Sequence, residues 1–292
     1  MSDARILDRG YRAYTGPRTG VRGAVRSLVV HSTQRALGLK RPVWQKVLPL
    51  LAVFIAYVPA IVFVGISVLL PDVLLDNAGV LPTYVDYYGF ISAAIVVFAA
   101  FVAPELLCTD RRTGMLGLYL ASPLTRNTYL LGKAVAVVVL LALVTLGPLL
   151  LMLAGFVIVG RGPDGPAAVA ELLLQMVLGG LAVAVVQAAL SLAVASTTSR
   201  KAAASAAIIL ILLASTAVSD ALLTSAAAPD IAFGLNLVQL PFELVARIYD
   251  EPSGITSARD IATGTIVALY AGWTALFAGF TWLRYRRMTV TR

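Results

Sequence analysis

Lys133 has the setting closest to nucleotide chemistry, because it ends a Leu-Leu-Gly-Lys run that begins at Leu130. A phosphate-binding P-loop places a glycine five residues before its Gly-Lys pair and a Ser or Thr directly after the lysine. Those two positions here hold Asn127 and Ala134. The sequence therefore predicts that this chain does not bind ATP by that route.

Metal, thiol and acid–base chemistry have few candidate residues. The chain has one histidine, His31, one cysteine, Cys108, and no His-Glu-x-x-His motif. We expect His31 to be a solvated or interfacial side chain and Cys108 to be buried rather than reactive. Hydrolytic work needs a nucleophile with a base, a metal or paired carboxylates. We therefore predict no catalytic residue, no metal site and no enzymatic activity in this chain.

Polar side chains are scarce in the long apolar segments. Glu105, Glu171 and Asp220 lie near segment ends, whereas a proton relay needs acids near the middle of a span. Gln175 and Gln187 both lie in the fourth apolar segment. The sequence leaves two roles open for them, hydrogen bonding between helices or lining a substrate pathway.

The stretch Asp110–Lys133 is a polar, basic region between two apolar segments. Its composition predicts a short helix followed by the start of a longer one. Asp110 or Thr113 is expected to cap the short helix, and Thr125 or Asn127 the long one.

The short helix, at about residues 110–126, is too apolar for a free loop. It is expected to stop at Ser122-Pro123, because residues before proline avoid the helical conformation. An apolar helix of this kind fills a groove on a partner, and the alternative is a helix that lies on the inner leaflet. The predicted docking residues are Asp110, Arg111, Arg112, Gly114, Met115, Leu116, Tyr119, Leu120, Ser122, Pro123 and Arg126.

The composition is that of an integral membrane protein. The 292 residues are 59% hydrophobic and 13% charged, with a mean hydropathy of +0.88, and water-soluble domains do not have this balance. A bilayer core needs about 20 apolar residues per helix. Six segments qualify: about 48–70, 87–108, 129–159, 169–196, 202–223 and 261–283. The first is expected to be a true span rather than a cleaved signal. The third is expected to bend at Gly147-Pro148.

The distribution of Lys and Arg predicts the orientation. Twenty of the 23 basic side chains fall before the first span, after the last one, or in the connections after the second and fourth. Cytoplasmic segments carry such an excess, so both termini are expected in the cytoplasm. The same bias accounts for the basic pI, and no nucleic-acid partner is expected.

Two further elements complete the predicted organisation. Residues 1–46 are expected to form a leader with a basic amphipathic helix from Thr19 or Gly20 to about Leu39, lying at the membrane interface. The alternative is a solvated basic leader with no specific role. Its apolar side comprises Val21, Val25, Leu28, Val29, Ala36 and Leu39. Residues 47–292 form the six-span domain. Its outer segment at about 224–260 is too apolar for a plain loop and is expected to form two short helices divided by Pro241, either dipping into the outer leaflet or capping the spans. Pro241 and Glu243 are candidate outer-gate residues.

The Asp110–Lys133 stretch resembles the motif block of permease subunits of type-2 ATP-binding-cassette (ABC) exporters. That block runs from an acidic-basic start through Gly-Thr-Leu and leucines to Ser/Thr-Pro-Leu-Ser/Thr-Arg and Leu-Gly-Lys. The chain departs from the usual residues at Asp110, Arg112 and Met115. The matching positions are Asp110, Arg111, Gly114, Met115, Leu116, Leu120, Ser122, Pro123, Leu124, Thr125, Arg126, Leu131, Gly132 and Lys133.

The resemblance implies an all-α permease with six spans and a coupling helix that docks into a separate ATPase subunit. It implies a second permease subunit, identical or different, two ATPase subunits that hold ATP and Mg²⁺, surrounding membrane lipids, and a place in the bacterial plasma membrane. The chain itself is expected to carry no cofactor. The alternative function is an ATP-independent secondary transporter or channel, which mid-span charges or paired broken helices would favour. The substrate is not indicated.

Overall fold

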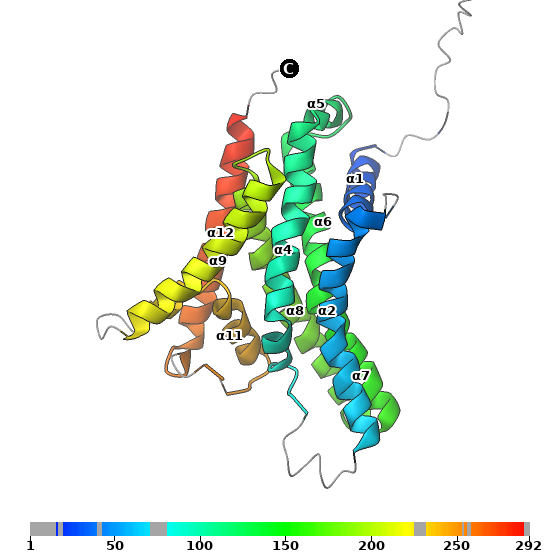
Figure 1. Ribbon diagram of the computed structural model, residues 1–292, viewed down its shortest axis with the longest axis vertical. Coiled ribbons are helices and arrows are strands. Elements are labelled where there is room, and N and C mark those ends of the chain that lie inside the picture. The colour runs from blue at the N-terminus through cyan, green and yellow to red at the C-terminus, as the bar shows by residue number, and fades with distance from the viewer. Residues whose placement is uncertain are drawn as a thin grey trace, which may run out of the picture.

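The computed structural model describes residues 16, 20–39, 43–70, 81–224, 232–252, 254–255 and 258–288. These residues form helices joined by turns, and no strand occurs among them. Figure 1 shows an elongated bundle of long helices with shorter elements at its two ends. The predicted all-α fold class is confirmed.

Six helical segments are long and apolar enough to cross a membrane, as predicted. In a bilayer a helix satisfies every backbone hydrogen bond within its own segment, which favours this form. The spans belong to α2 (Val43–Leu69), α4 (Tyr87–Arg112), α6 with α7 (Arg126–Thr145 and Gly147–Val159), α8 (Gly165–Ala195), α9 (Lys201–Thr224) and α12 (Thr263–Arg287).

The third span breaks where the sequence predicts it. α6 ends at Thr145 and α7 begins at Gly147, with Pro148 in the first turn of α7. N–H groups in the first turn have no partner within the helix, so a proline there costs no hydrogen bond. The Tyr57 hydroxyl of α2 donates to the Leu143 carbonyl at 3.1 Å. A Cβ atom on Gly147 would lie 1.7 Å from that hydroxyl oxygen. Glycine at this position therefore lets the Tyr57 side chain pack against the break.

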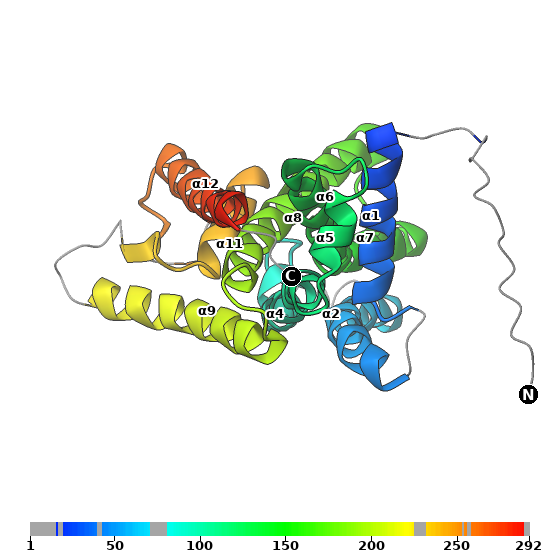
Figure 2. The same ribbon diagram turned by 90° about the horizontal axis from the view of Figure 1, so that it is seen from above.

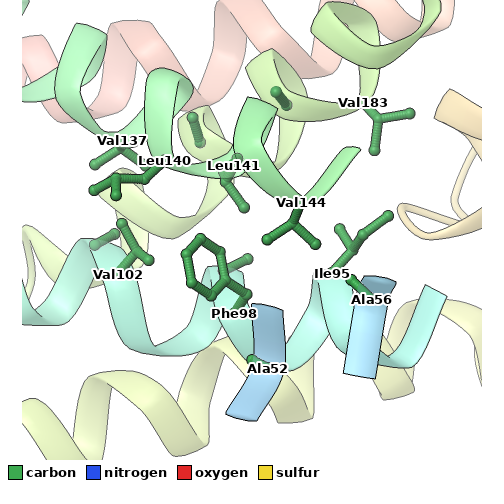
Figure 3. Close-up of a cluster of buried hydrophobic side chains, with 14 of the residues drawn as sticks. Ala52, Ala56, Ile95, Phe98, Val102, Val137, Leu140, Leu141, Val144 and Val183 are labelled. Carbon is green, nitrogen blue, oxygen red and sulfur yellow. The ribbon is translucent and has the colours of Figure 1, made fainter. Parts of the chain in front are cut away.

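The centre of the bundle lies between α4 and α6. Phe98 of α4 packs among side chains of α6, with Ala52 of α2 beside it, as Figure 3 shows. α8 packs on both α4 and α6, and Val183 of α8 borders the same cluster. α9 and α12 lie at the margin, where large apolar side chains such as Leu210 and Leu276 are exposed. Such faces suit lipid or another membrane subunit.

The two ends of the bundle differ in charge. At one end of the bundle α4, α8 and α12 end and α6 and α9 begin. This end carries Arg111, Arg126, Lys201 and Arg284, and we call it the basic end. The opposite, acidic end carries Asp86, Asp164, Glu251 and Asp260.

The amphipathic helix predicted near the N-terminus is present as α1 (Gly20–Ala36). Figure 1 shows α1 nearly end-on at the basic end, and Figure 2 shows it lengthwise, so it lies across the spans. Leu28 and Ala36 are buried on α6 and α4, whereas Val21 and Leu39 are exposed. The predicted apolar side is thus only partly buried. A Cβ atom on Gly132 would lie 2.9 Å from a Leu28 methyl carbon, so glycine at this position allows α1 to approach α6 closely.

The outer segment differs from its prediction. Pro241 does not divide two helices; it lies within the first turn of α11 (Gln239–Ile248). The first N–H groups of a helix have no intrahelical partner, so proline is tolerated there. α11 packs on α8 and α12 at the acidic end, burying Leu240 and Val245. Residues 225–231 lie outside the described part of the chain.

Candidate functional site

The Asp110–Lys133 stretch forms the end of α4, the short helix α5 (Met115–Leu120) and the start of α6. Figure 1 shows α5 at the tip of the basic end. Gly114, with φ of 68°, turns the chain between α4 and α5, a left-handed conformation that glycine adopts at little cost. α5 ends before Ser122-Pro123, as predicted, and the Ser122 hydroxyl donates to the Tyr119 carbonyl at 2.6 Å.

One of the predicted caps is present and the other is wrong. Thr125 caps α6 in a reciprocal box with Thr128: Thr125 Oγ1 accepts from the Thr128 N–H at 3.3 Å, and Thr128 Oγ1 accepts from the Thr125 N–H at 2.8 Å. α5 has no side-chain cap. Asp110 lies inside α4, and the Thr113 hydroxyl donates back to the Thr109 carbonyl at 2.8 Å. Neither side chain is therefore at the start of α5 to cap it.

α5 has an anchored side and a free side. Leu116 and Tyr119 are half-buried and pack against the core of the bundle. Burial and the nearby Asp110 carboxylate raise the pKa of Tyr119, so its phenol is neutral. Leu118 is 66% exposed, although the sequence placed it outside the docking set. The free side of α5 is thus centred on Leu118, and the other exposed side chains near it are Arg112, Ser122, Pro123 and Arg126.

Asp110 lies beneath this surface rather than on it. Its side chain and that of Lys133 are both 0% exposed. Asp110 Oδ2 lies 2.7 Å from Lys133 Nζ and accepts from the Tyr129 hydroxyl at 2.9 Å. Asp110 Oδ1 accepts from Arg35 Nη2 at 2.7 Å. Lys133 Nζ also donates to Ser32 Oγ at 3.0 Å. We call these five residues the Asp110 cluster.

The Asp110 cluster joins three helices. Arg35 and Ser32 come from α1, Asp110 from α4, and Tyr129 and Lys133 from α6. Arg35 Nη2 also donates to the carbonyls of residues 105 and 106 on α4. Breaking a buried ion pair by removing one partner costs about 3–5 kcal/mol, because a charge is left without its counter-ion. The cluster therefore fixes α1 against α4 and α6.

Sequence reasoning gave Lys133 no role and missed Ser32 and Arg35. A signal was present, since Leu28, Ser32 and Arg35 share one face of α1 by helical spacing. A charged side chain on a face that packs inward requires a buried partner.

The remaining arginines of the stretch point in different directions. Arg111 donates through Nη1 to the carbonyls of Ser196 and Thr198 at 2.6 and 3.1 Å, which ties α4 to the turn after α8. Arg126 donates to the Arg286 carbonyl at 2.9 Å while staying exposed. An open cavity of about 470 Å³ beside α4 is lined by Arg111, Phe280, Leu283, Arg284, Arg287 and Met288. This end of the bundle thus offers positive charge to a partner.

The other predicted residues are far from α5. Gln187 is buried, and its amide nitrogen donates to the Leu237 carbonyl at 3.2 Å, which connects α8 to the segment before α11. Gln175 is half-buried toward the acidic end of α8. Glu243 is 1% exposed and pairs with Arg247 at 2.8 Å within α11. Cys108 is buried, as expected. Among the described residues no group of three or more His, Cys, Asp or Glu side chains has the arrangement of a metal site.

Within the described residues this architecture defines a class, a multi-pass helical membrane protein with six candidate spans, α1 and α5 at the basic end and α11 at the acidic end. Comparison with known proteins then gives the family. The family model described as ABC-2 family transporter protein matches residues 69–283, and the chain belongs to that family. A search of curated proteins finds no match. Membership makes the chain a membrane permease subunit of an ABC transporter and implies ATPase subunits as its partners.

Proposed function

We propose that this chain is the membrane-spanning subunit of an ATP-driven exporter, forming half of the substrate pathway, and that α5 is its coupling helix. The supporting observation is the free side of α5, where Leu118 is exposed at the tip of the basic end; Arg112 before α5 and Arg126 after it are exposed as well. An apolar anchor flanked by arginines suits a cleft on a separate subunit. The ATP and Mg²⁺ belong to that ATPase subunit.

The Asp110 cluster would transmit movement of α5 to the helices of the bundle. ATP-driven closure of two ATPase subunits would push on α5, whose half-buried Leu116 and Tyr119 rest on the bundle. Because the cluster ties α1, α4 and α6 together beneath α5, those three helices would move as one unit. We therefore assign Asp110 and Lys133 positioning roles. α11, with Pro241 and Glu243, would gate the exit at the acidic end.

The exposed apolar faces support a second permease subunit. Large apolar side chains such as Phe54, Leu213 and Leu276 are exposed on α2, α9 and α12. Lipid covers some of this surface, and we infer that a second permease subunit covers part of it and completes the pathway. Gln175 and Gln187 are our candidates for lining it; Gln187 Oε1 has no hydrogen-bond partner within the described residues.

We also propose that the basic end faces the bacterial cytoplasm, because Lys and Arg accumulate on that side of a membrane. Cysteines introduced by Ser122→Cys and Asp164→Cys test this, since both positions are exposed and lie at opposite ends. An impermeant maleimide applied to intact cells is expected to label the Asp164→Cys chain only, and lysis is expected to expose the other. The parent chain is the control, since Cys108 is buried. Labelling of Ser122→Cys in intact cells would reverse the topology.

Co-purification tests the function itself. The tagged chain, extracted from its native membrane in mild detergent, is expected to bring a subunit with Walker A and B motifs, identified by mass spectrometry. The complex is expected to hydrolyse ATP, and the isolated chain is not. If the chain moves cargo across a vesicle membrane with no ATPase subunit present, the proposal is wrong and a secondary transporter replaces it.

A further inference from the structure

An apolar groove lies between α6 and α12. Both helices pack on α8, and Figure 2 shows α8 between them. The groove has a volume of about 480 Å³, within the range of small-molecule sites. Side chains from all three helices line it, among them Ala134 and Val138 of α6, Ala188 of α8 and Ala278 of α12. None of its described lining residues is charged.

The polar side chains that line the groove already bond within the chain. The Thr274 and Thr281 hydroxyls donate to carbonyls one turn earlier in α12, each at 2.8 Å. Asn127 Oδ1 accepts from Trp282 Nε1 at 3.3 Å. Along most of its length the groove therefore offers an occupant van der Waals contact and little else, which suits a hydrocarbon chain.

The length of the groove matches one leaflet of a bilayer. Its lining residues on α6 run from Asn127 to Val138, which spans about 16 Å at about 1.5 Å per residue. Half of the hydrocarbon core of a bilayer is about 15 Å. On α12 the lining runs from Trp282 back to Thr274, so both walls extend from the basic end toward the middle of the bundle. An acyl chain of the leaflet at the basic end can therefore lie in the groove over its full depth.

Two arginines lie at the mouth of the groove, at the basic end. Arg126 Nη1 donates to the Arg286 carbonyl at 2.9 Å, so its guanidinium is turned toward α12. The Arg286 guanidinium lies over the Trp282 ring, 5.2 Å from the ring centroid, a cation–π contact that keeps it beside the groove. Both arginines are exposed, and no carboxylate among the described residues pairs with either. The mouth therefore carries two cations that lack a counter-ion within the described residues.

A second copy of the chain would supply no such counter-ion. The described acids at the basic end are Glu105 and Asp110; Lys201 pairs with the first, and Arg35 and Lys133 pair with the second. A copy in the same membrane orientation would also present its own arginines at this level. Charge complementarity thus favours an anionic lipid over a permease subunit as the occupant of this groove.

We propose that this groove is a binding site for an anionic phospholipid. One acyl chain lies between α6 and α12, and the phosphodiester accepts N–H bonds from Arg126 and Arg286. Basic pockets between membrane-spanning helices bind anionic headgroups on the cytoplasmic side, the side to which we assign the basic end. The Asn127 amide, whose oxygen is held by Trp282, presents its NH2 group as a further donor. The test uses the chain without its ATPase subunit, so its outcome is independent of the proposed ATP coupling.

The probes are phosphatidylglycerol and phosphatidylcholine with the same acyl chains. The full-length chain in mild detergent is mixed with equal amounts of both, and the retained lipid is measured by native mass spectrometry. Phosphatidylglycerol is expected to be retained about tenfold more tightly. Equal retention of the two lipids would overturn the proposal. Glycerol phosphate, which has the headgroup without the chains, is expected not to displace the lipid; displacement would assign the site to a free phosphate ester and contradict the role of the groove.

Arg286→Gln and Ala278→Phe test the two halves of the site. Arg286→Gln removes a charged donor at the mouth, so affinity for phosphatidylglycerol is expected to fall about tenfold, as for loss of a hydrogen bond to a charged group. Ala278→Phe puts a ring into the groove from an exposed position on α12, so it is expected to displace the acyl chain and abolish selective retention. The melting temperature in phosphatidylcholine is expected to stay the same for both, because neither side chain is buried. Wild-type affinity in either variant would overturn the proposal.

Two controls match these variants. Arg284→Gln removes an exposed arginine of α12 that lines the cavity beside α4 instead of the groove, and Ala206→Phe adds the same ring at an exposed position of α9. Both are expected to retain phosphatidylglycerol as the parent chain does. Equal losses in Arg284→Gln and Arg286→Gln would show attraction by the basic end as a whole and contradict a specific site. If Ala278→Phe changes the oligomeric state of the chain but not lipid retention, a second copy covers the groove and the proposal is wrong.

Discussion

Replacing Leu118 by Asp is expected to detach the ATPase subunit while leaving the chain folded in the membrane. Leu118 is 66% exposed and sits on the free side of α5, so the substitution removes no contact within the bundle. In a cleft of the partner, however, it would bury an unpaired carboxylate. Anchor residues of this kind contribute about 2–4 kcal/mol, so the dissociation constant is expected to rise about 30- to 1000-fold.

The measurement is binding of the purified ATPase subunit to the chain in nanodiscs, with the melting temperature of each variant recorded in parallel. Leu39→Asp is the matched control, because Leu39 is 49% exposed at the same end, in the turn after α1. It is expected to leave affinity unchanged. Leu116→Asp gives a contrast, since Leu116 packs on the core and its loss is expected to lower stability too. Wild-type affinity in Leu118→Asp would remove α5 from the interface.

Replacing Lys133 by Met is expected to cost about 1.5–3 kcal/mol of stability, as for loss of a hydrogen bond between charged groups. The substitution keeps the side-chain volume close to that of lysine, but Asp110 then remains at 0% exposure with Arg35 as its sole cationic partner in the Asp110 cluster. Equilibrium unfolding in mixed micelles measures the change.

The double variant Asp110→Asn/Lys133→Met isolates the charge. The amide oxygen of the introduced asparagine can still accept from Arg35, and its NH2 group can donate to the Tyr129 hydroxyl oxygen. No buried carboxylate is left without its lysine. Much of the lost stability is therefore expected to return, which is non-additivity of the kind that neighbouring residues show. If Lys133→Met is as stable as the parent chain, the buried pair contributes nothing to the fold. Additive losses in the double variant would show that the two residues act separately.

The spans and the elements between them could be predicted because each depends on a local property. Apolar length marks the six spans, Pro148 marks the break between α6 and α7, and Thr125, one of two candidate caps, marks the start of α6. The excess of Lys and Arg likewise predicts that the connections after the second and fourth spans lie at the same end of the bundle. None of these inferences requires knowledge of which helices touch.

The orientation of α5 could not be predicted, because six residues are too few for a periodic pattern and its packing depends on distant parts of the bundle. The prediction from the sequence therefore placed Leu116 and Tyr119 in the docking set and left out Leu118. Asp110 was placed on that surface as a possible cap of the short helix and as the start of the motif block. Its burial depends on Lys133 and Arg35, which are distant in sequence and meet only in the folded bundle. Pro241 was misread because proline breaks a helix in its interior but fits its first turn.

The arrangement around Asp110 has a consequence for biogenesis. During synthesis, α1 and α4 emerge before α6. The Asp110 carboxylate therefore reaches the membrane boundary after Arg35 has emerged but while Lys133 is still inside the ribosome. The Asp110 cluster is complete only after the third span has been inserted and Leu28 has packed against Gly132. Until then the Asp110 carboxylate is paired with Arg35 alone, and Leu28 of α1 lacks its packing site at Gly132. Packing of α1 is therefore a late event in the maturation of this subunit, even though α1 is made first.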